Sequence, residues 1–382
     1  MIPLAERGHR AAFADQLRGL AALMVVLSHH AGDFWHLQPA VAAMTGLPAA
    51  FEAPPPGTAF LAPLVSGPFG MGAAGVALFF LISGYVIPFG LRGRDRGGFL
   101  LARLVRLMPT YWAGFAFQAL VIFAALRLMG GSFPRGTEEV VLNFLPGLHL
   151  LAWRPSMDGI VWTLDVEVLF YLAAAAAAPA LLARSALWLA VPGLAALLGA
   201  GLMLFPGWAA GPPSHLLRAG TGLSLAAPML VFMGVGTVLH LAEADRRWRR
   251  AAFALVPLLL VLSAALLMGS PWTGIAAQIP AYLAMAALFT GAHALRDRIP
   301  ALRWPTRLAR ISYSLYVVHG VSGFAVMGVL ANRGWPPLAV FAAGMAYSLL
   351  VALLLHRLVE EPTRRLSARL GRRADVAVTV AP

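Results

Sequence analysis

The sequence of 382 residues contains no cysteine and no lysine, and only 12% of its residues are charged. Without cysteine the chain cannot form disulfides, Fe–S clusters, thiolate zinc sites or a cysteine nucleophile. Because ordinary soluble domains carry about 25% charged residues, the low charge excludes a soluble globular enzyme, a disordered chain and a coiled coil. Hydrophobic residues instead make up 60% of the chain. This composition is typical of a polytopic membrane protein.

The charge that is present is unbalanced. The chain has 29 basic residues, all arginine, and 16 acidic residues, which gives a formal net charge of +13. Nucleic-acid binding is not expected, because the arginines lie between apolar segments rather than on one soluble face. Arginine in place of lysine, alongside abundant alanine and glycine, also suits a GC-rich genome and is not by itself functional.

The apolar runs predict an all-α, polytopic integral membrane protein with about ten transmembrane helices. The first run is too long for a signal peptide and has no small-residue cleavage site, so we expect it to remain as a helix. We expect a transmembrane domain over residues 1–365 and a short basic cytoplasmic tail over 366–382, lying on the anionic inner leaflet. The expected spans are 17–37, 73–91, 109–129, 160–180, 185–205, 223–241, 252–269, 274–294, 311–330 and 337–358.

The arginines predict the orientation of these helices, because cytoplasmic loops of membrane proteins are enriched in basic residues. One set of alternate connections, together with both ends of the chain, holds nearly all of them. The opposite set holds only Arg135, Arg154, Arg218 and Arg333. We therefore expect both termini in the cytoplasm, which requires an even number of helices.

Ionisable residues inside a membrane helix are costly and are functional candidates by default. In the first helix, His29 follows Arg18 by eleven residues, about 16 Å along the axis and on the same face. Asp33 is four residues further on that face and could fix the tautomer of His29. A lone histidine would more often satisfy a neighbouring carbonyl, but three such residues in one stripe favour a functional site. His30 points about 100° away and is the weaker candidate.

Three further segments carry polar residues that have both a structural and a functional interpretation. Ser83-Gly84 permits a close approach between helices or a contact with substrate. Arg103 and Arg106, at i and i+3, form a paired guanidinium group that suits phosphates, or are plain positive-inside charge. Asp165 and Glu167 differ by two positions, so they face different ways and do not form an acid–base dyad.

Towards the end of the chain, His319 lies in the outer half of the predicted helix over 311–330. The last helix closes with Glu360-Glu361-Pro362. We expect Pro362 to end it on the inner side, because proline cannot continue a regular helix.

Taken in order, these segments resemble the acyltransferase-3 family of membrane O-acyltransferases, over about residues 15–365. No single motif is specific, but the ordered series is. It comprises Arg18 with His29, Gly75–Tyr85, Arg103 and Arg106 before Pro109, Tyr111-Trp112, Trp162-Thr163-Leu164 through Glu167 to Phe170-Tyr171, Ser312–Tyr316 with His319, and Glu360 with Pro362.

The resemblance implies a bacterial inner-membrane enzyme that moves an acyl group, usually acetyl, from cytoplasmic acyl-CoA to a hydroxyl of a sugar-containing acceptor. The family's functional arginine and histidine of the first helix map onto Arg18 and His29. Its paired arginines map onto Arg103 and Arg106, and its helix carboxylate onto Glu167. The family's WSLSVEEQFY-like pattern departs here at Asp165, Val168 and Leu169.

The resulting hypothesis places the CoA phosphates on three arginines at the inner mouth. His29 acts as general base on the acceptor hydroxyl or transiently accepts the acyl group, and Asp33 or Glu167 steadies the imidazolium. No metal is expected, because no His/Asp/Glu set has ligand spacing. The arginines are Arg18, Arg103 and Arg106, and the expected substrate contacts are Ser83, Trp162, Asp165, Tyr171 and His319.

The competing interpretation is a proton-coupled transporter or a flippase of a lipid-linked sugar, since intramembrane His, Arg and Glu also serve transport. No paired halves with interrupted helices are visible, which speaks against it. Consumption of acyl-CoA by the purified protein distinguishes the two. The acceptor could be a surface polysaccharide, a lipid-linked sugar, a glycolipid or a small glycosylated metabolite. The acyl length and the oligomeric state also stay open.

Overall fold

The computed structural model describes residues 4–58, 62–63, 67–152, 156–204, 215–270, 274–300 and 302–370, and the side chains of 4–11 and 215–217 are left out. Within these ranges the chain is helical and contains no β-strand. The predicted all-α class is confirmed.

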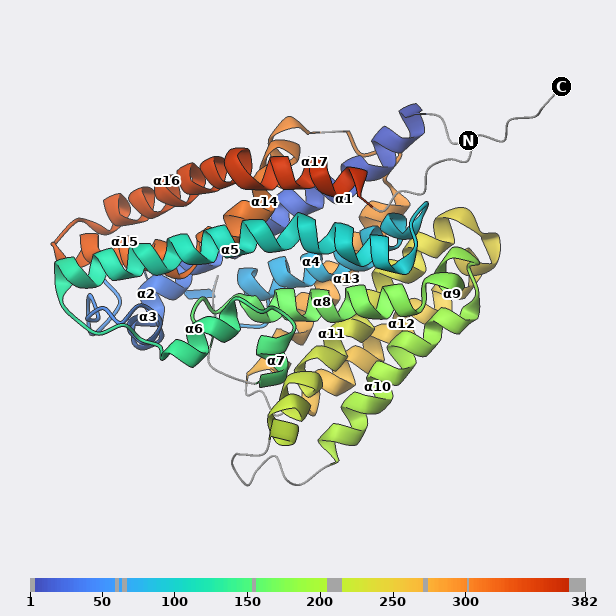
Figure 1. The fold of residues 1–382 in the computed structure, drawn as a ribbon, viewed down its shortest axis with the longest axis horizontal. Helices are drawn as coiled ribbons and strands as arrows, with labels where there is room; N and C mark the ends of the chain where they lie inside the picture. The colour runs from blue at the N-terminus through green and yellow to red at the C-terminus, as the bar shows by residue number, and fades with distance from the viewer. Residues whose placement is uncertain are drawn as a thin grey trace.

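The helices form two groups that lie against each other (Figure 1). The first group contains the helices that line the candidate site. It consists of α1 (Leu4–Leu27), η1 (Ser28–Asp33), α2 (Phe34–His36), α3 (Gln38–Thr45), α4 (Met71–Val86), η3 (Ile87–Leu91), α5 (Arg96–Met129), α6 (Thr137–Asn143), α7 (Leu148–Ala152), α8 (Val161–Ala176), α14 (Arg303–Val318), α15 (Val321–Asn332), α16 (Pro337–Leu355), η7 (His356–Glu360) and α17 (Glu361–Arg369). The second group consists of α9 (Ala178–Leu182), η4 (Ala186–Leu189), α10 (Ala190–Met203), α11 (His215–Ala244), α12 (Arg246–Met268), η6 (Ile275–Gln278) and α13 (Ile279–Ala294).

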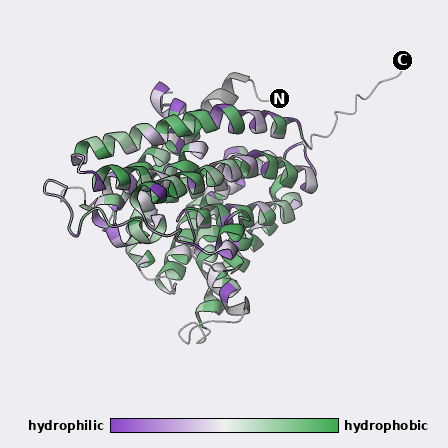
Figure 2. Cartoon of the chain, turned by 60° about the vertical axis from the view of Figure 1, so that its left-hand side comes forward, coloured by the Kyte–Doolittle hydropathy of each residue, from purple (hydrophilic) through white to green (hydrophobic). Residues whose placement is uncertain are grey.

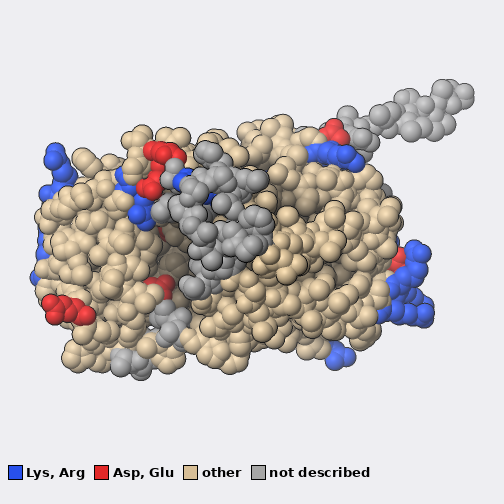
Figure 3. Space-filling model, turned by 90° about the horizontal axis from the view of Figure 1, so that it is seen from below, with Lys and Arg blue, Asp and Glu red and all other residues tan. Residues whose placement is uncertain are grey.

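Seven helices of the described chain are long and apolar enough to cross a membrane, and the bent pair α14 and α15 brings the number to eight. The predicted total of ten stays a prediction. Of the expected spans, α8 is short, with 16 residues, and α1 carries Asp15 and Arg18 in its middle. The long helices are predominantly hydrophobic along their length (Figure 2). On the face in Figure 3, charged side chains lie mostly toward the two ends. The chain is therefore a polytopic membrane protein.

The arginine-rich segments share one end of the molecule. Helices α1, α5 and α12 begin at this end, and α17 ends there (Figure 1). Residues 366–369 of the expected tail belong to α17, where the Ser367 hydroxyl donates to the carbonyl of Ala102 in α5 at 2.6 Å. Residues 371–382 lie outside the described residues. That both ends of the helical part lie together agrees with an even number of crossings.

The expectation of one helix over 311–330 is wrong. The chain bends by 70° between α14 and α15, at His319 and Gly320. The His319 ring donates from Nδ1 to the carbonyls of Leu315 and Tyr316, both at 2.9 Å. Its own backbone carbonyl accepts from His30 Nε2 at 2.8 Å. Side chains thus satisfy backbone groups at the break, which a membrane protein requires.

The expectation that Pro362 ends the last helix is also wrong, since α16 continues through η7 into α17. The π-helical turn of η7 lies just before the proline, and the N–H of Glu361 donates to the carbonyl of His356, five residues back. This wider turn accommodates a residue that has no N–H and would otherwise clash with the preceding turn. A second π-helical segment, η1, carries His29 and Asp33.

Glycines bring α1, α4, α11 and α14 close together. A Cβ built on Gly84 would lie 2.0 Å from the carbonyl oxygen of Met233 in α11, and one on Gly19 would lie 2.1 Å from that of Pro305 in α14. Small residues let helix backbones approach in this way. The close approach predicted at Gly84 is confirmed, and the adjacent Ser83 faces the cavity described next.

Candidate active site

A cavity of about 320 Å³ lies between α1, α4, α5, α8, α14 and η7. Its lining combines charged and aromatic side chains. Five arginines line it, namely Arg18, Arg103, Arg106, Arg310 and Arg364, with the carboxylates of Asp15, Glu167 and Glu360. Positive charge therefore exceeds negative charge around this space.

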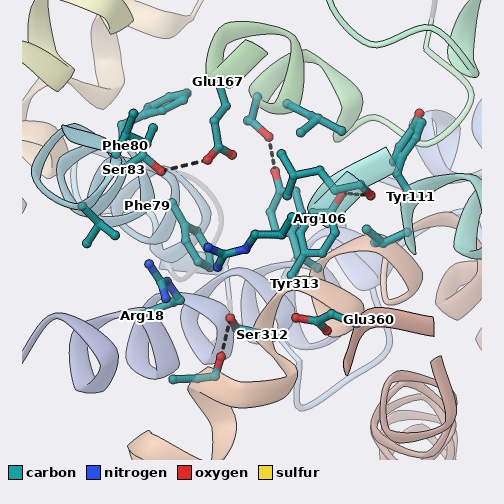
Figure 4. A pocket seen from close by; sticks show the side chains of 18 of the residues that line it. Arg18, Phe79, Phe80, Ser83, Arg106, Tyr111, Glu167, Ser312, Tyr313 and Glu360 are labelled. Carbon is teal, nitrogen blue, oxygen red and sulfur yellow. Dashed lines mark hydrogen bonds between the residues drawn. The ribbon is translucent and has the colours of Figure 1, made fainter. Parts of the chain in front are cut away.

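Arg18 and Arg106 extend toward each other across the cavity (Figure 4). Arg18 donates to Asp15, one turn earlier in α1, at 3.3 Å. Arg106 forms no hydrogen bond or ion pair with any residue that the structure describes. Two guanidinium groups that face each other, one of them unpaired, are suited to an anion that carries several oxygens.

Arg103 lines the same cavity but is held more firmly by the protein. Its guanidinium carbon lies 5.4 Å from the ring centre of Phe99 and 5.3 Å from that of Tyr171. It also donates to the carbonyl of Ile87 at 3.4 Å. The predicted pair is thus asymmetric: Arg106 is free to bind a ligand, whereas Arg103 also joins α5 to α8 and η3.

Glu167 is the carboxylate at the centre of the lining. Its Oε1 accepts from the Ser83 hydroxyl at 3.3 Å and from the Tyr171 hydroxyl at 2.5 Å. These two donors come from α4 and from the next turn of α8, so the carboxylate is fixed in orientation. The structure brings together Ser83, Glu167 and Tyr171, which the sequence predicts as site residues.

Asp165, two residues before Glu167, lies outside the cavity lining, as the predicted difference in direction requires. It is fully buried and accepts from the backbone N–H of Gly147 at 2.5 Å and from His149 Nδ1 at 3.0 Å. Its observed role is to hold the segment before α7 against α8. Trp162 also lies outside the lining, edge-on to Phe80 at 6.0 Å between ring centres.

Tyr316 and Thr163 also line the cavity, and their hydroxyl groups are 2.7 Å apart. The ring of Tyr316 packs against Phe79, with the ring centres 5.6 Å apart. The ring of His319 is also adjacent to Tyr316, with the ring centres 5.9 Å apart. Tyr316 therefore connects the cavity lining to a cluster of histidines.

That cluster contains His29, His30 and His319. The rings of His29 and His319 are 4.9 Å apart, and His29 Nε2 lies 3.8 Å from Asp33 Oδ2. None of these residues belongs to the lining of the cavity among the residues described. The predicted stripe of Arg18, His29 and Asp33 thus reaches from the cavity to the space beyond Tyr316.

Several lining residues belong to the ordered series in the sequence but are given no individual role there. Tyr313 and Tyr316, one turn apart in α14, both face the cavity. Glu360 accepts from the Ser314 hydroxyl at 2.6 Å and from His356 Nδ1 at 3.0 Å. Helical spacing could have indicated the tyrosines, but no local pattern joins Glu360 to a residue 46 positions away.

Outside the cavity, burial raises the pKa of the Asp158 carboxyl, which precedes α8. Asp158 Oδ1 nevertheless accepts from the backbone N–H groups of Ile160 and Val161, each at 3.0 Å. It thereby caps the helix that carries Glu167. Within the described ranges, no three His, Asp or Glu side chains are placed to hold a metal ion.

A helical membrane fold around one polar cavity, with a histidine cluster beside it, is the framework of a membrane-embedded enzyme. Comparison with known proteins identifies which one. A family model described as an acyltransferase domain, Acyl_transf_3, matches residues 12–357, and the chain belongs to this family. The protein is therefore a membrane acyltransferase, as the sequence predicts.

The chain is also 28% identical over 350 residues to the acyltransferase MdmB of Streptomyces mycarofaciens. This similarity covers 82% of the chain and 85% of that protein. No solved structure matches the chain.

Proposed function

We propose that this membrane acyltransferase takes its acyl group, by default acetyl, from cytoplasmic acyl-CoA and transfers it to a hydroxyl of a sugar-containing acceptor. The observation that carries the proposal is the pair of guanidinium groups of Arg18 and Arg106, which face each other in the cavity (Figure 4). CoA is a multiply phosphorylated donor, and arginine is the residue best suited to bind phosphate oxygens.

The size of the cavity suits one end of such a donor. At about 320 Å³, it lies at the lower limit of ligand pockets, about 300–1,000 Å³. The phosphates of CoA would stay among the arginines at the mouth, and the narrow thioester arm would enter. Ser83 and Tyr171, which orient Glu167, would then lie beside the acyl end.

His29 is the proposed base on the acceptor side. It lies beyond Tyr316, in contact with His319, and is partly accessible, with 21% of its side chain exposed. There it would remove the proton from the acceptor hydroxyl or transiently accept the acyl group. Asp33, 3.8 Å away, would stabilise the resulting imidazolium. Donor and acceptor would then approach from opposite sides and meet at Tyr316.

The proposed setting is the inner membrane of a bacterium, with lipid around the apolar helices. Exposed leucine and phenylalanine side chains cover α10 and α12, as at Leu197 (71% exposed) and Phe253 (84%). The arginine-rich end of the molecule would face the cytoplasm and its acyl-CoA. No nucleic-acid partner is proposed.

The test is thioester consumption by the purified protein in nanodiscs. Radiolabelled acetyl-CoA and a crude envelope-glycan extract would be given to the wild type, His29→Ala and His36→Ala. His36 is a matched control, because it follows His29 by seven residues and, among the described residues, its ring bonds only to the carbonyl of Thr58, at 3.1 Å. We expect label in an alkali-labile glycan fraction with the wild type and His36→Ala alone. A transporter would leave the acetyl-CoA intact, and full transfer by His29→Ala would contradict the proposed base.

A further inference from the structure

The hydrogen bonds of the His319 ring show which of its two nitrogens carries the hydrogen. His319 Nδ1 lies 2.9 Å from the carbonyls of both Leu315 and Tyr316. Carbonyl oxygens only accept, so Nδ1 carries the hydrogen and Nε2 carries the lone pair. That Nε2 is buried and has no hydrogen-bond partner among the described residues. It can therefore accept a hydrogen bond that no described residue donates.

His29 also has a ring nitrogen without a hydrogen-bond partner. Its Nδ1 is buried and also has no partner in the described part of the chain. Its ring lies between His319, at 4.9 Å, and Phe324, against which it stacks at 5.7 Å and 16°. Its Nε2 is on the side of Asp33. Two buried nitrogens without partners therefore belong to rings in contact.

We propose that His319 is a positioning residue for His29, whose Nδ1–H donates to His319 Nε2 during the reaction. A buried polar atom without a partner is unfavourable, and a small rotation of the His29 ring would satisfy both atoms at once. This inference rests on the proposed role of His29 as the base. It assigns the lone pair of His29 to Nε2, the nitrogen on the accessible side.

His30 does not serve this purpose, although it is the adjacent residue. Its Nε2 donates to the backbone carbonyl of His319 at 2.8 Å. Its Nδ1 lies beside Gly344 of α16, 3.6 Å from a Cβ built there. Its structural role is to hold the break between α14 and α15, and hence the backbone that carries the His319 ring.

The break in the helix explains why the His319 ring is fixed. The bend of 70° leaves carbonyls at the end of α14 that the helix itself does not satisfy. The His319 ring satisfies those of Leu315 and Tyr316 and thereby presents Nε2 in one direction. Irregular backbone at membrane depth is tolerated where it is buried in protein or lines a cavity, and here it orients an imidazole.

The step that this arrangement serves is the attack of the acceptor hydroxyl. Its O–H bond breaks, the proton goes to His29 Nε2, and the oxygen forms a bond to the acyl carbon. The C–S bond breaks, and its electron pair leaves with the sulfur of CoA as a thiolate. The His29 imidazolium, held by His319 at Nδ1 and by Asp33 at Nε2, then returns the proton to yield the CoA thiol.

The test uses the full chain in nanodiscs with ¹⁵N-labelled histidine rings, whose shifts distinguish the tautomers by NMR. Loss of a signal in His29→Gln identifies His29. We expect the Nδ1–H form of His29 in the wild type and in His319→Gln, whose amide oxygen can replace the acceptor. In His319→Phe, which removes the acceptor but keeps a ring, the population of the Nε2–H form of His29 should increase. A wild-type His29 in the Nε2–H form would overturn the proposal, and this needs no variant of His319.

Kinetics supply the second readout. We expect His319→Phe to lower kcat for acetyl transfer roughly 100-fold with little change in KM for acetyl-CoA, and His319→Gln to stay within about tenfold of the wild type. Equal losses in both variants, or none, would contradict a positioning role. A wild type that transfers no acyl group but shows the dependence of tautomer on His319 would uphold the positioning and refute the proposed function.

Discussion

Replacing Arg106 with alanine is expected to weaken the binding of CoA without disturbing the fold. Within the described residues, Arg106 has no hydrogen bond or ion pair that its removal would leave unsatisfied. Arg18 remains opposite, still paired with Asp15 at 3.3 Å. The cavity therefore loses one guanidinium group that could bind phosphate and keeps another. The affinity for CoA falls but is not abolished.

The size of the effect follows from the interaction that is lost. A hydrogen bond to a charged group contributes about 1.5–3 kcal/mol, and each 1.4 kcal/mol is a factor of ten in affinity. We expect the Kd of CoA to rise roughly 10- to 150-fold. Because the interaction is partly exposed to salt, the difference from the wild type should shrink as ionic strength rises.

The assay is calorimetric titration of CoA into the protein in nanodiscs, at low and high salt. Arg127→Ala is the matched control, since Arg127 is in the same helix, 21 residues further on, with its guanidinium carbon 5.5 Å from the ring centre of Phe123 and outside the cavity. It should bind CoA as the wild type does. Equal affinity of Arg106→Ala and the wild type, or equal loss in both variants, would refute the assignment of Arg106 to the donor.

Three further predictions follow from the structure. Glu167→Gln should keep the fold but lower kcat roughly 100-fold, measured with acetyl-CoA, and an unchanged kcat would exclude a role for the carboxylate. Gly84→Ala places a methyl group against the backbone of α11 and should cost about 1–3 kcal/mol, whereas Gly193→Ala, with nothing within 4 Å, should not destabilise; thermal unfolding in detergent checks both. Asp158→Ala removes the cap of α8 and should cost about 1 kcal/mol, seen as a lower Tm in the same assay.

The sequence is informative where spacing along one helix decides the outcome. Arg18 faces the cavity, Glu167 lies in its wall, and Asp165 lies outside it because two positions reverse the direction of a side chain. Tyr171, one turn after Glu167 in the same helix, donates to its carboxylate. These arrangements depend on helical periodicity alone, whereas Ser83 reaches Glu167 from another helix, α4.

The sequence does not predict contacts between residues from distant parts of the chain. The break at His319 interrupts a predicted continuous span, and hydrogen bonds between side chains and backbone, which the sequence does not reveal, satisfy the backbone there. The partner of Asp165, His149, lies 16 residues away in a different helix. The turn before Pro362 adopts a π-helical form that no residue pattern predicts, and so the proline is accommodated.

We propose that the acyl donor enters from the arginine-lined end, on the cytoplasmic side. The most direct test compares sealed bacterial membrane vesicles of right-side-out and inverted orientation that contain the protein, with radiolabelled acetyl-CoA added outside. We expect labelled, alkali-labile glycan only in inverted vesicles, where the cytoplasmic face is exposed, and at least tenfold less label with Arg106→Ala at low acetyl-CoA. Equal labelling by intact right-side-out vesicles would contradict it.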